Sequence, residues 1–379
     1  MTTSAVAPPA ARLRTELVTR PEQARALAPE WEALARRSGA GPLSLPDYCL
    51  DWWHHLGRGR LLVATVRDQD GSLLALAPLH ERGLGPARVV RWLGHGLGTV
   101  AQVLLEPGRE DAARALWAAV ARRGRVLELT ETRADRPGVP DPAALDGPSR
   151  RTTVTPRDEC PVCDLTDDDG LGVVRAQGNK NLRKSLKRAD AALEQRGATF
   201  DVEVATDRPG FEALLPAVRE VFDDAEADRP RQHFLRPPYE PMTLDYLRRR
   251  FDDGAAVLLV GHVGGRPIAF QAGMVDAGPD TDGGTVSLWL ARFHPEFADL
   301  KPGYLLQRAT FTWAARAGLR RVDLLLGASQ TKRQWSTDSY GTLQVTSGHP
   351  LLLRVASAAE AVLARRRERA TAPAEPNGD

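Results

Sequence analysis

The sequence predicts a mixed α/β fold made of two tandem copies of one unit. Two observations carry this prediction. The predicted elements follow the same order in both halves, and matching positions are separated by a nearly constant offset. The length of 379 residues suits two domains that each bury a core of their own. Each copy contains an antiparallel hairpin, so we expect mixed sheets.

The second half gives the order of elements. It reads as a strand, two helices, a hairpin, a strand, a helix and a buried closing strand. Gly264-Gly265 is a dipeptide typical of hairpin turns. Pro302-Gly303 precedes the apolar-periodic helix. The predicted segments are 199–206, 211–224, 242–252, the hairpin runs either side of Gly264, 284–297, 304–318 and 321–327.

The first half repeats this order, with a strand at 13–19, helices at 21–37 and 46–56, and a hairpin around Asp70-Gly71. Gly264 follows Asp70 by 194 residues, Pro302 follows Pro107 by 195, and Val322 follows Val126 by 196. The helices that contain Trp117 and Trp313 share a Trp-Ala-Ala sequence, and both indoles are expected in the core. The nearly constant offset predicts an internal duplication.

We expect a disordered tail at 1–12, a first unit at 13–165, a second unit at 166–350, and a C-terminal helix and disordered tail at 351–379. The boundary falls near the segment 133–151, which is rich in Pro, Gly and Asp. The stretch TTVTPRDECPVCDL is expected to complete the first sheet. A basic helix at about 175–196 then leads into the second unit.

Composition excludes several classes of protein. No apolar run approaches the ~20 residues of a membrane span. The net charge of +2 is unlike that of a dedicated nucleic-acid binder. Three cysteines exclude a secreted disulfide scaffold and fit a reducing cytoplasm. We expect a cytoplasmic monomer or homodimer.

Motifs for metal or covalent chemistry are missing. Cys160-Pro-Val-Cys163 has no second pair of ligands, so we interpret it as a structural strand and expect no metal. There is no GxSxG or HExxH motif. The glycine cluster at 94–98 opens no clear helix and is interpreted as a turn.

Several segments resemble GNAT acyltransferases, and two copies in one chain resemble the FemAB-like/CelD-like branch of that superfamily. PEWEALARRSG and PLSLPDYCLDWW are similar to the opening helices of the family. CPVCDL is similar to the strand that precedes its Arg-rich helix, and FHPEFADLKPGYLLQ to its strand-to-helix passage. DLLLGASQTKRQW is similar to its closing motif, although Thr331 stands where relatives have an aromatic residue.

The resemblance implies an N-acetyltransferase-like enzyme that transfers an acyl group to the amine of a small-molecule or polymer-linked acceptor. The implied donor is acyl-CoA, with aminoacyl-tRNA as the nearest alternative. A non-catalytic GNAT-like binding protein in a polysaccharide or natural-product pathway is the alternative of another class. The first copy lacks a counterpart of the closing motif, so we expect it to serve as scaffold and as part of the acceptor cleft.

The expected site lies in the second copy. By resemblance, the charge of Lys332 supports the transfer step, because a fixed cation stabilises a developing oxyanion. Asp323 accepts from the substrate amine or has a structural role, and Tyr340 protonates the leaving thiolate. His233 is the expected general base or a solvated loop histidine. The remaining expected residues are Lys301, Gly303 and Tyr304 for the CoA diphosphate, and Arg231, Tyr239, Gln271, Trp289 and Trp335 for substrate.

The run NKNLRKSLKR carries five positive charges and no negative ones. It is interpreted either as the solvated face of a helix or as a surface for CoA phosphates or for tRNA, if tRNA is a partner. Its basic residues are Lys180, Arg183, Lys184, Lys187 and Arg188.

Overall fold

The computed structural model describes residues 13–83, 88–122, 126–147, 149–228, 234–276 and 283–354. The predicted tail at 1–12 and most of the predicted C-terminal segment lie outside these ranges. So do Arg231 and His233. No helix within the described part of the chain is both long enough and apolar enough to cross a membrane.

The elements of the first half follow the predicted order. The helices at 21–37 and 46–56 are present, the first of them divided into two. In chain order the elements are β1 (Arg14–Val18), α1 (Pro21–Ala26), α2 (Ala28–Arg37), η1 (Pro42–Ser44), α3 (Pro46–Leu56), β2 (Arg60–Arg67), β3 (Leu73–Arg82), β4 (Val89–Trp92), β5 (Leu104–Leu105), α4 (Glu110–Ala121), β6 (Val126–Arg133), α5 (Pro142–Leu145) and β7 (Arg151–Asp164).

The second half repeats the order and adds a basic helix before it and a strand after it. Its elements are α6 (Gly172–Arg175), α7 (Lys180–Gln195), β8 (Phe200–Ala205), α8 (Arg208–Asp228), α9 (Glu240–Asp252), β9 (Ala256–Val263), β10 (Arg266–Asp276), β11 (Thr285–Phe293), η3 (Pro295–Leu300), α10 (Pro302–Arg316), β12 (Arg321–Asp323), α11 (Gln330–Gln334) and β13 (Asp338–Gly348).

The described strands form one continuous sheet in the order β1-β2-β3-β4-β6-β13-β7-β12-β11-β10-β9-β8, and the short β5 pairs with β3 outside this order. The run β1-β2-β3-β4-β6 and the run β8-β9-β10-β11-β12 are copies of each other, read inward from the two ends of the sheet. In each copy one pair is parallel, β4 with β6 and β11 with β12, and the remaining pairs are antiparallel. Both the mixed α/β class and the duplication are therefore confirmed.

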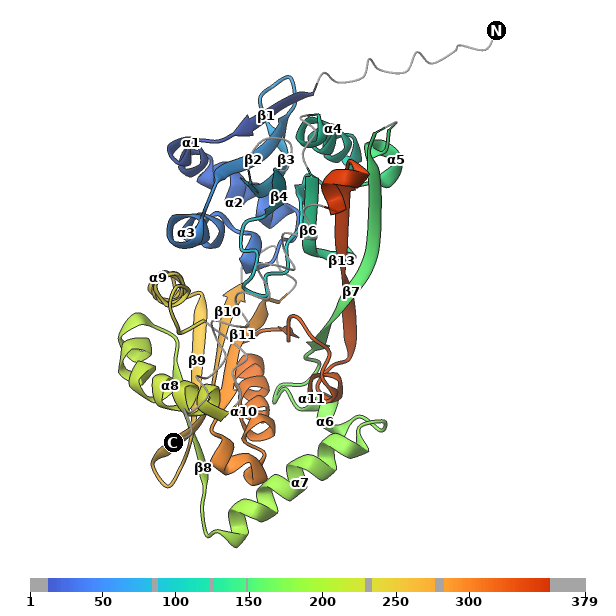
Figure 1. Cartoon of the computed structure of the whole chain (residues 1–379). Helices are drawn as coiled ribbons and strands as arrows, with labels where there is room; N and C mark the ends of the chain where they lie inside the picture. Colours follow the sequence, from blue (N-terminus) through green and yellow to red (C-terminus); the bar gives the residue numbers. More distant parts are fainter. Residues whose placement is uncertain are drawn as a thin grey trace, which may run out of the picture.

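The two copies exchange strands at the centre of the sheet. The expectation that the segment of β7 completes the first sheet is wrong, because β13, from the end of the second half, lies beside β6 instead. β7 pairs with β13 along its length and reaches β12 of the second copy at its carboxyl end. In Figure 1 these two long strands connect the two lobes of the molecule. Each copy therefore depends on backbone from the other half of the chain.

Local signals explain the hairpins. Gly264 and Gly265 both have positive φ values, of 59° and 79°, as the tight turn between β9 and β10 requires. In the first copy the turn is closed by Asp68, whose Oδ1 accepts from the amides of Asp70 (3.1 Å) and Ser72 (2.8 Å). Both predicted hairpins are confirmed.

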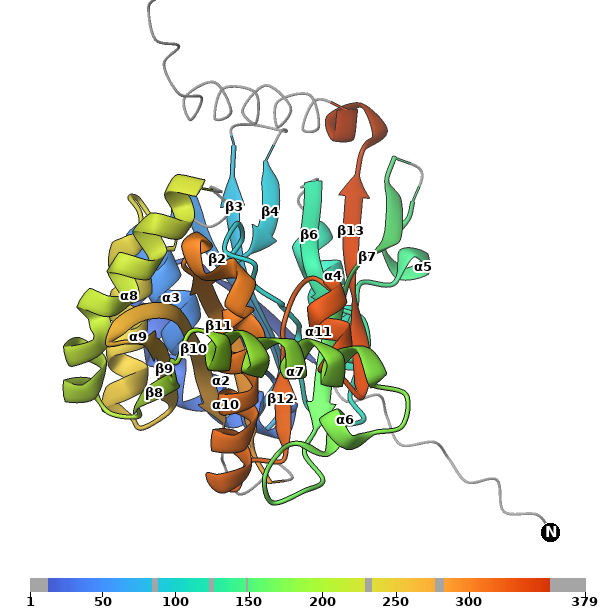
Figure 2. The same ribbon diagram turned by 90° about the horizontal axis from the view of Figure 1, so that it is seen from below.

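Helices cover both faces of the sheet, and three main apolar clusters result. One cluster lies under α4 in the first copy, and a second lies under α10 and α7 in the second copy. The largest belongs to both copies, because it contains residues of α2 and α3 and of α8 and α9, with α3 in contact with α9. In Figure 1 α9 lies between α3 and α8, and Figure 2 shows these helices on one side of the sheet. Trp117 is in the first cluster, as predicted, whereas Trp313 is only half-buried against the second.

The strand exchange predicts that a mutation near the C-terminal end weakens the first half. Val345 of β13 is fully buried in the α4 cluster, so Val345→Ala should cost about 1–3 kcal/mol of unfolding free energy. Hydrogen exchange should accelerate in α4 and β6 more than in α8. Thr346→Ala, on the neighbouring half-buried position, is the control. Faster exchange in α8 alone would contradict the exchanged-strand core.

Candidate active site

The candidate site lies where β11 and β12 separate. The two strands pair over only three residues, and the last pair is Ser287 with Asp323. β11 continues to Phe293 beside β10 alone. Strand backbone groups point toward both neighbours, so beyond Ser287 the side of β11 that faced β12 has no strand partner among the described elements. Such an edge accepts an extended ligand.

A bulge marks the same stretch of β11. Leu288 lies opposite Gly273 and Leu290 opposite Ala272, which leaves Trp289 as the extra residue. Bulges interrupt the ladder and redirect backbone and side chain. The open edge of β11 is therefore also irregular at the position next to the end of β12.

Asp323 organises the turn that follows β12. Its Oδ1 accepts from the Leu325 amide at 2.8 Å, and its Oδ2 accepts from the Tyr340 hydroxyl at 2.9 Å. Leu325 has φ +53°, a left-handed conformation that costs a non-glycine residue about 1–3 kcal/mol and needs support from its surroundings. Burial raises the pKa of Asp323 above its usual value.

Lys332 holds the same turn from the other side. Its Nζ donates to the carbonyl oxygens of Leu324 and Leu326, each at 2.6 Å. Burial lowers the pKa of the ammonium, and the nearby Cys160 and Asp323 partly oppose this effect. An ammonium has three N–H donors, so two are used by the turn and one is left for a ligand.

Tyr340 links this turn to the first copy. The Arg133 guanidinium of β6 lies 4.0 Å from the centroid of the Tyr340 ring, a cation–π contact. Cys160 is the register partner of Tyr340 on β7. Burial raises the pKa of Tyr340 well above its usual value and that of Cys160 to about 12. Near pH 7 both groups stay protonated, so the Cys160 thiol is no nucleophile.

The segment expected to bind the CoA diphosphate begins α10. Lys301 is in a left-handed conformation with φ +53°, and its Nζ lies 5.5 Å from the centroid of the Tyr304 ring. Pro302 has no N–H, and the Tyr304 amide donates to the Lys301 carbonyl at 2.9 Å. Within the described first turn this leaves the Gly303 amide for an anion. The Tyr304 hydroxyl donates to Gln334 Oε1 at 3.2 Å, two residues after Lys332 in sequence.

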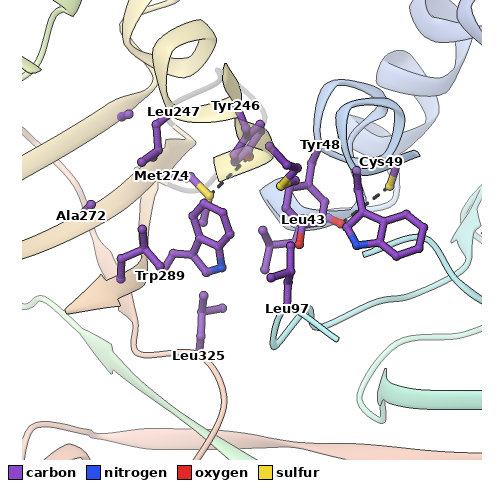
Figure 3. Close-up of a cluster of buried hydrophobic side chains, with 14 of the residues drawn as sticks. Leu43, Tyr48, Cys49, Leu97, Tyr246, Leu247, Ala272, Met274, Trp289 and Leu325 are labelled. Carbon is purple, nitrogen blue, oxygen red and sulfur yellow. Dashed lines mark hydrogen bonds between the residues drawn. The ribbon is translucent and has the colours of Figure 1, made fainter. Parts of the chain in front are cut away.

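Trp289 lies at the junction of the two copies (Figure 3). Its ring makes edge contacts with Tyr48 of α3, Tyr246 of α9 and Phe234, with centroids 5.4–6.0 Å apart. Its Nε1 is buried without a hydrogen-bond partner among the described residues, which leaves a donor beside the open edge of β11. The half-buried Tyr239 packs against the same apolar cluster.

Two other residues that we expected to bind substrate have buried side chains with partners in the core. Trp335 is fully buried against Phe311, with ring centroids 4.9 Å apart. Gln271 Oε1 accepts from Thr310 Oγ1 at 2.9 Å, on the face of β10 next to α10. Neither side chain therefore forms the wall of an open pocket.

The basic helix α7 is exposed along one side. Arg183 donates to the carbonyls of Val174 and Ala176, whereas Lys180, Lys184, Lys187 and Arg188 are exposed. Within the described residues, no group of three or more His, Cys, Asp or Glu side chains could hold a metal ion.

Two contributors were not anticipated from sequence. Arg133 belongs to the other copy, so only the tertiary fold brings it to Tyr340. Leu325 adopts a left-handed conformation that leucine rarely takes. The one local signal was Asp323 two residues earlier, since Asp often accepts from the amide two positions on.

Residues 180–333 match the family model described as acetyltransferase (GNAT) domain. This segment runs from α7 to α11 and contains β11, β12 and Lys332. A search of curated proteins found no match.

Three similar solved structures extend over most of the chain. The C-terminal domain (DUF2156) of a presumed lysylphosphatidylglycerol synthetase from Agrobacterium fabrum is 14% identical with a TM-score of 0.53, covering 94% of this chain and 99% of that one. A conserved protein of unknown function from Bacteroides thetaiotaomicron is 11% identical with a TM-score of 0.56, covering 88% and 100%. FemX is 12% identical with a TM-score of 0.56, covering 88% and 96%.

These identities show a shared fold, whereas the family model identifies the segment that contains the separated strands β11 and β12. The second half of the chain, over residues 180–333, is therefore a GNAT-type acyltransferase domain, and the chain as a whole has the fold of FemX.

Proposed function

We propose that the protein transfers an acyl group from acyl-CoA to the amine of a small-molecule or polymer-linked acceptor. The observation that carries the proposal is the unpaired edge of β11 beyond Ser287, beside the turn that Lys332 holds. The pantetheine arm of CoA contains two amide groups, and these are suited to pair with an open strand edge. The thioester would then lie next to the end of β12.

The proposed step needs few groups. A neutral amine attacks the thioester carbonyl, the C–N bond forms, the C–S bond breaks, and the amine proton is lost as CoA leaves as a thiol. The remaining N–H of Lys332 and the unpaired amides of β11 are the proposed donors to the oxyanion. Tyr340 donates to Asp323 and is proposed to act by keeping that carboxyl and the turn in place. His233 stays the proposed base.

Charge favours CoA over aminoacyl-tRNA as the donor. The net charge of the chain is +2, which is unlike that of a dedicated nucleic-acid binder. Lys301 and the Gly303 amide are proposed to meet the diphosphate, with a single free amide in place of the several that a phosphate loop supplies.

We propose the division into a unit at 13–165 and a unit at 166–350, with the first as scaffold and part of the acceptor cleft. A cytoplasmic location is also proposed. It is supported by the three cysteines, which are all buried and unpaired, as thiols are in a reducing compartment.

Lys332→Met should lower kcat for acyl transfer by about 10²–10³-fold, because it removes a cationic donor from the oxyanion. The measurement is CoA thiol release from acetyl-CoA with a panel of amines. Arg333→Met is the matched control, since this neighbour on α11 is 63% exposed and pairs with Glu159 at the surface. Equal activity of the two variants would exclude the proposed role, and a melting temperature for each separates catalysis from lost turn structure.

The raised pKa of Asp323 predicts that the stability of the protein depends on pH. Because its pKa is raised in the folded state, the stabilising contribution is complete below the unfolded value of about 3.8 and is lost as pH rises through the folded pKa. The unfolding free energy of wild type minus that of Asp323→Asn should therefore fall between pH 4 and pH 8, measured by urea denaturation. A difference that grows with pH would show that the carboxylate is stabilised, contrary to its burial.

Salt dependence distinguishes the two donors. Replacing Lys184, Lys187 and Arg188 by Ala should leave the KM for acetyl-CoA and its salt dependence nearly unchanged. If aminoacyl-tRNA is the donor, the same triple variant should flatten the slope of log affinity against log salt by about 2–3. An RNase-sensitive reaction that ignores acetyl-CoA would overturn the CoA proposal.

A further inference from the structure

A cavity of about 380 Å³ lies in the first copy, and Lys332 is not among the residues that line it. Its walls come from the glycine-rich loop after β4, from β6, and from β7 and β13. This volume falls at the lower end of small-molecule sites, which span roughly 300–1,000 Å³.

The cavity occupies the position in the first copy that the transfer site occupies in the second. β4 and β6 pair in parallel only at Val89 with Val126 and at Val90 with Leu127, just as β11 and β12 pair briefly and then separate. Matching the starts of the two parallel pairs places Leu127 at the position of Val322, one residue from the match of Val126 with Val322 predicted from sequence. Glu128 is then at the position of Asp323. Burial agrees, because the residues before them, Leu127 and Val322, both pack under the helix of their copy.

The same position has different surroundings in the two copies. In the second, Asp323 is buried under Tyr340 and the turn that Lys332 holds. In the first, Glu128 lines an open cavity. The Arg91 Nε and Nη2 both donate to Glu128 Oε2, at 3.2 Å and 2.7 Å. Among the described residues no hydrogen bond reaches Glu128 Oε1, so this oxygen remains as an acceptor for a ligand.

The cavity wall alternates strong acceptors with strong donors. Arg157 Nε donates to Glu131 Oε1 at 2.5 Å, and Arg157 Nη1 donates to Gln344 Oε1 at 3.1 Å, which leaves Nη2 of this 42% exposed side chain. The Thr130 hydroxyl is bonded to the His95 ring at 3.2 Å. Carboxylates matched by arginines suit a neutral ligand whose groups both donate and accept, and a hydroxyl group does both.

The glycine loop gives such a ligand room and lies against the second copy. A Cβ at Gly96 would meet nothing within 4 Å, whereas one at Gly94 would meet Thr99 Oγ1 at 2.7 Å. Gly94 thus permits close packing, and Gly96 faces open space. At the end of the loop, a Cβ at Gly98 would lie 3.8 Å from Leu326, whose carbonyl binds Lys332.

We propose that this cavity binds the hydroxylated ring of the acceptor, an amino sugar or a sugar that carries an amine. The hydroxyls bind Glu128, Arg157 and Gln344. The amine makes no contact with a carboxylate, because a carboxylate would favour its protonated form and a nucleophilic amine must be neutral. The loop at 94–98 then directs the ring toward the turn at Leu326. The role as acceptor pocket rests on the proposed acyl transfer, but binding of the ring does not.

Binding is tested without any acyl donor. Saturation-transfer NMR at millimolar concentration compares glucosamine with cyclohexylamine, which keeps a ring and an amine but has no hydroxyl. Glucosamine should bind and cyclohexylamine should not. Glu128→Gln should bind glucosamine about tenfold more weakly, as for loss of one hydrogen bond to a charged group. Arg157→Met should act similarly, and its partly exposed side chain makes misfolding less of a concern.

Glu212→Gln is the matched control, since this carboxylate pairs with Arg208 and Arg248 on the surface of α8. No glucosamine binding, equal binding of cyclohexylamine, or unchanged binding in both folded cavity variants would overturn the proposal.

Transfer from acetyl-CoA to glucosamine is measured separately. The cavity variants should raise the KM for glucosamine and leave kcat nearly unchanged, whereas Lys332→Met should lower kcat. Binding without any transfer would contradict the proposed function and leave the cavity assignment in place. Transfer with an unchanged KM in both cavity variants would contradict the cavity assignment and leave the proposed function.

Discussion

The insertion of β13 between β6 and β7 is the constraint on which the rest of the structure depends. It satisfies the backbone of two strands that would otherwise be open edges. It also joins the copies into one sheet, so that α3 of the first half packs against α9 of the second. The apolar cluster at that junction, with Tyr48, Tyr246 and Trp289 in mutual edge contact, follows from this arrangement. Each unit therefore needs a strand and apolar contacts from the other in order to fold.

β13 also positions residues of the candidate site. Tyr340 lies on β13, and its hydroxyl reaches Asp323 on β12 while Arg133 on β6 covers its ring. One strand thus carries a contact from the first copy to the turn that Lys332 holds in the second. The turn needs this support because Leu325 is in a left-handed conformation and Lys332 is partly removed from water. We infer that the role of Lys332 is as much to shape the end of β12 as to supply charge.

The two copies arrange the same strand position differently. In both copies a short parallel pair of strands separates, after three residue pairs in the second copy and two in the first, with Glu128 and Asp323 at equivalent positions. In the second copy the segment Leu324–Leu326 turns toward β7, where the Leu324 amide donates to the Pro161 carbonyl at 3.0 Å. In the first copy β6 continues as a strand to Arg133, and the space beside it remains a cavity. The proposed donor edge in one copy and the proposed acceptor cavity in the other are thus consistent with a ligand site in the ancestral unit.

The sequence by itself determined the duplicated order of elements, both hairpins, the helices at 46–56 and 242–252, and the motif that contains Asp323 and Lys332. These depend on local signals: Gly264-Gly265 permits positive φ, and apolar periodicity defines each helix. Only the tertiary structure decided that β13 and not β7 lies beside β6, that Arg133 covers Tyr340, and that Trp335 is buried against Phe311. Those contacts join residues far apart in the chain, where pairing is chosen by which surfaces and strand edges meet after folding, and no local pattern encodes that choice.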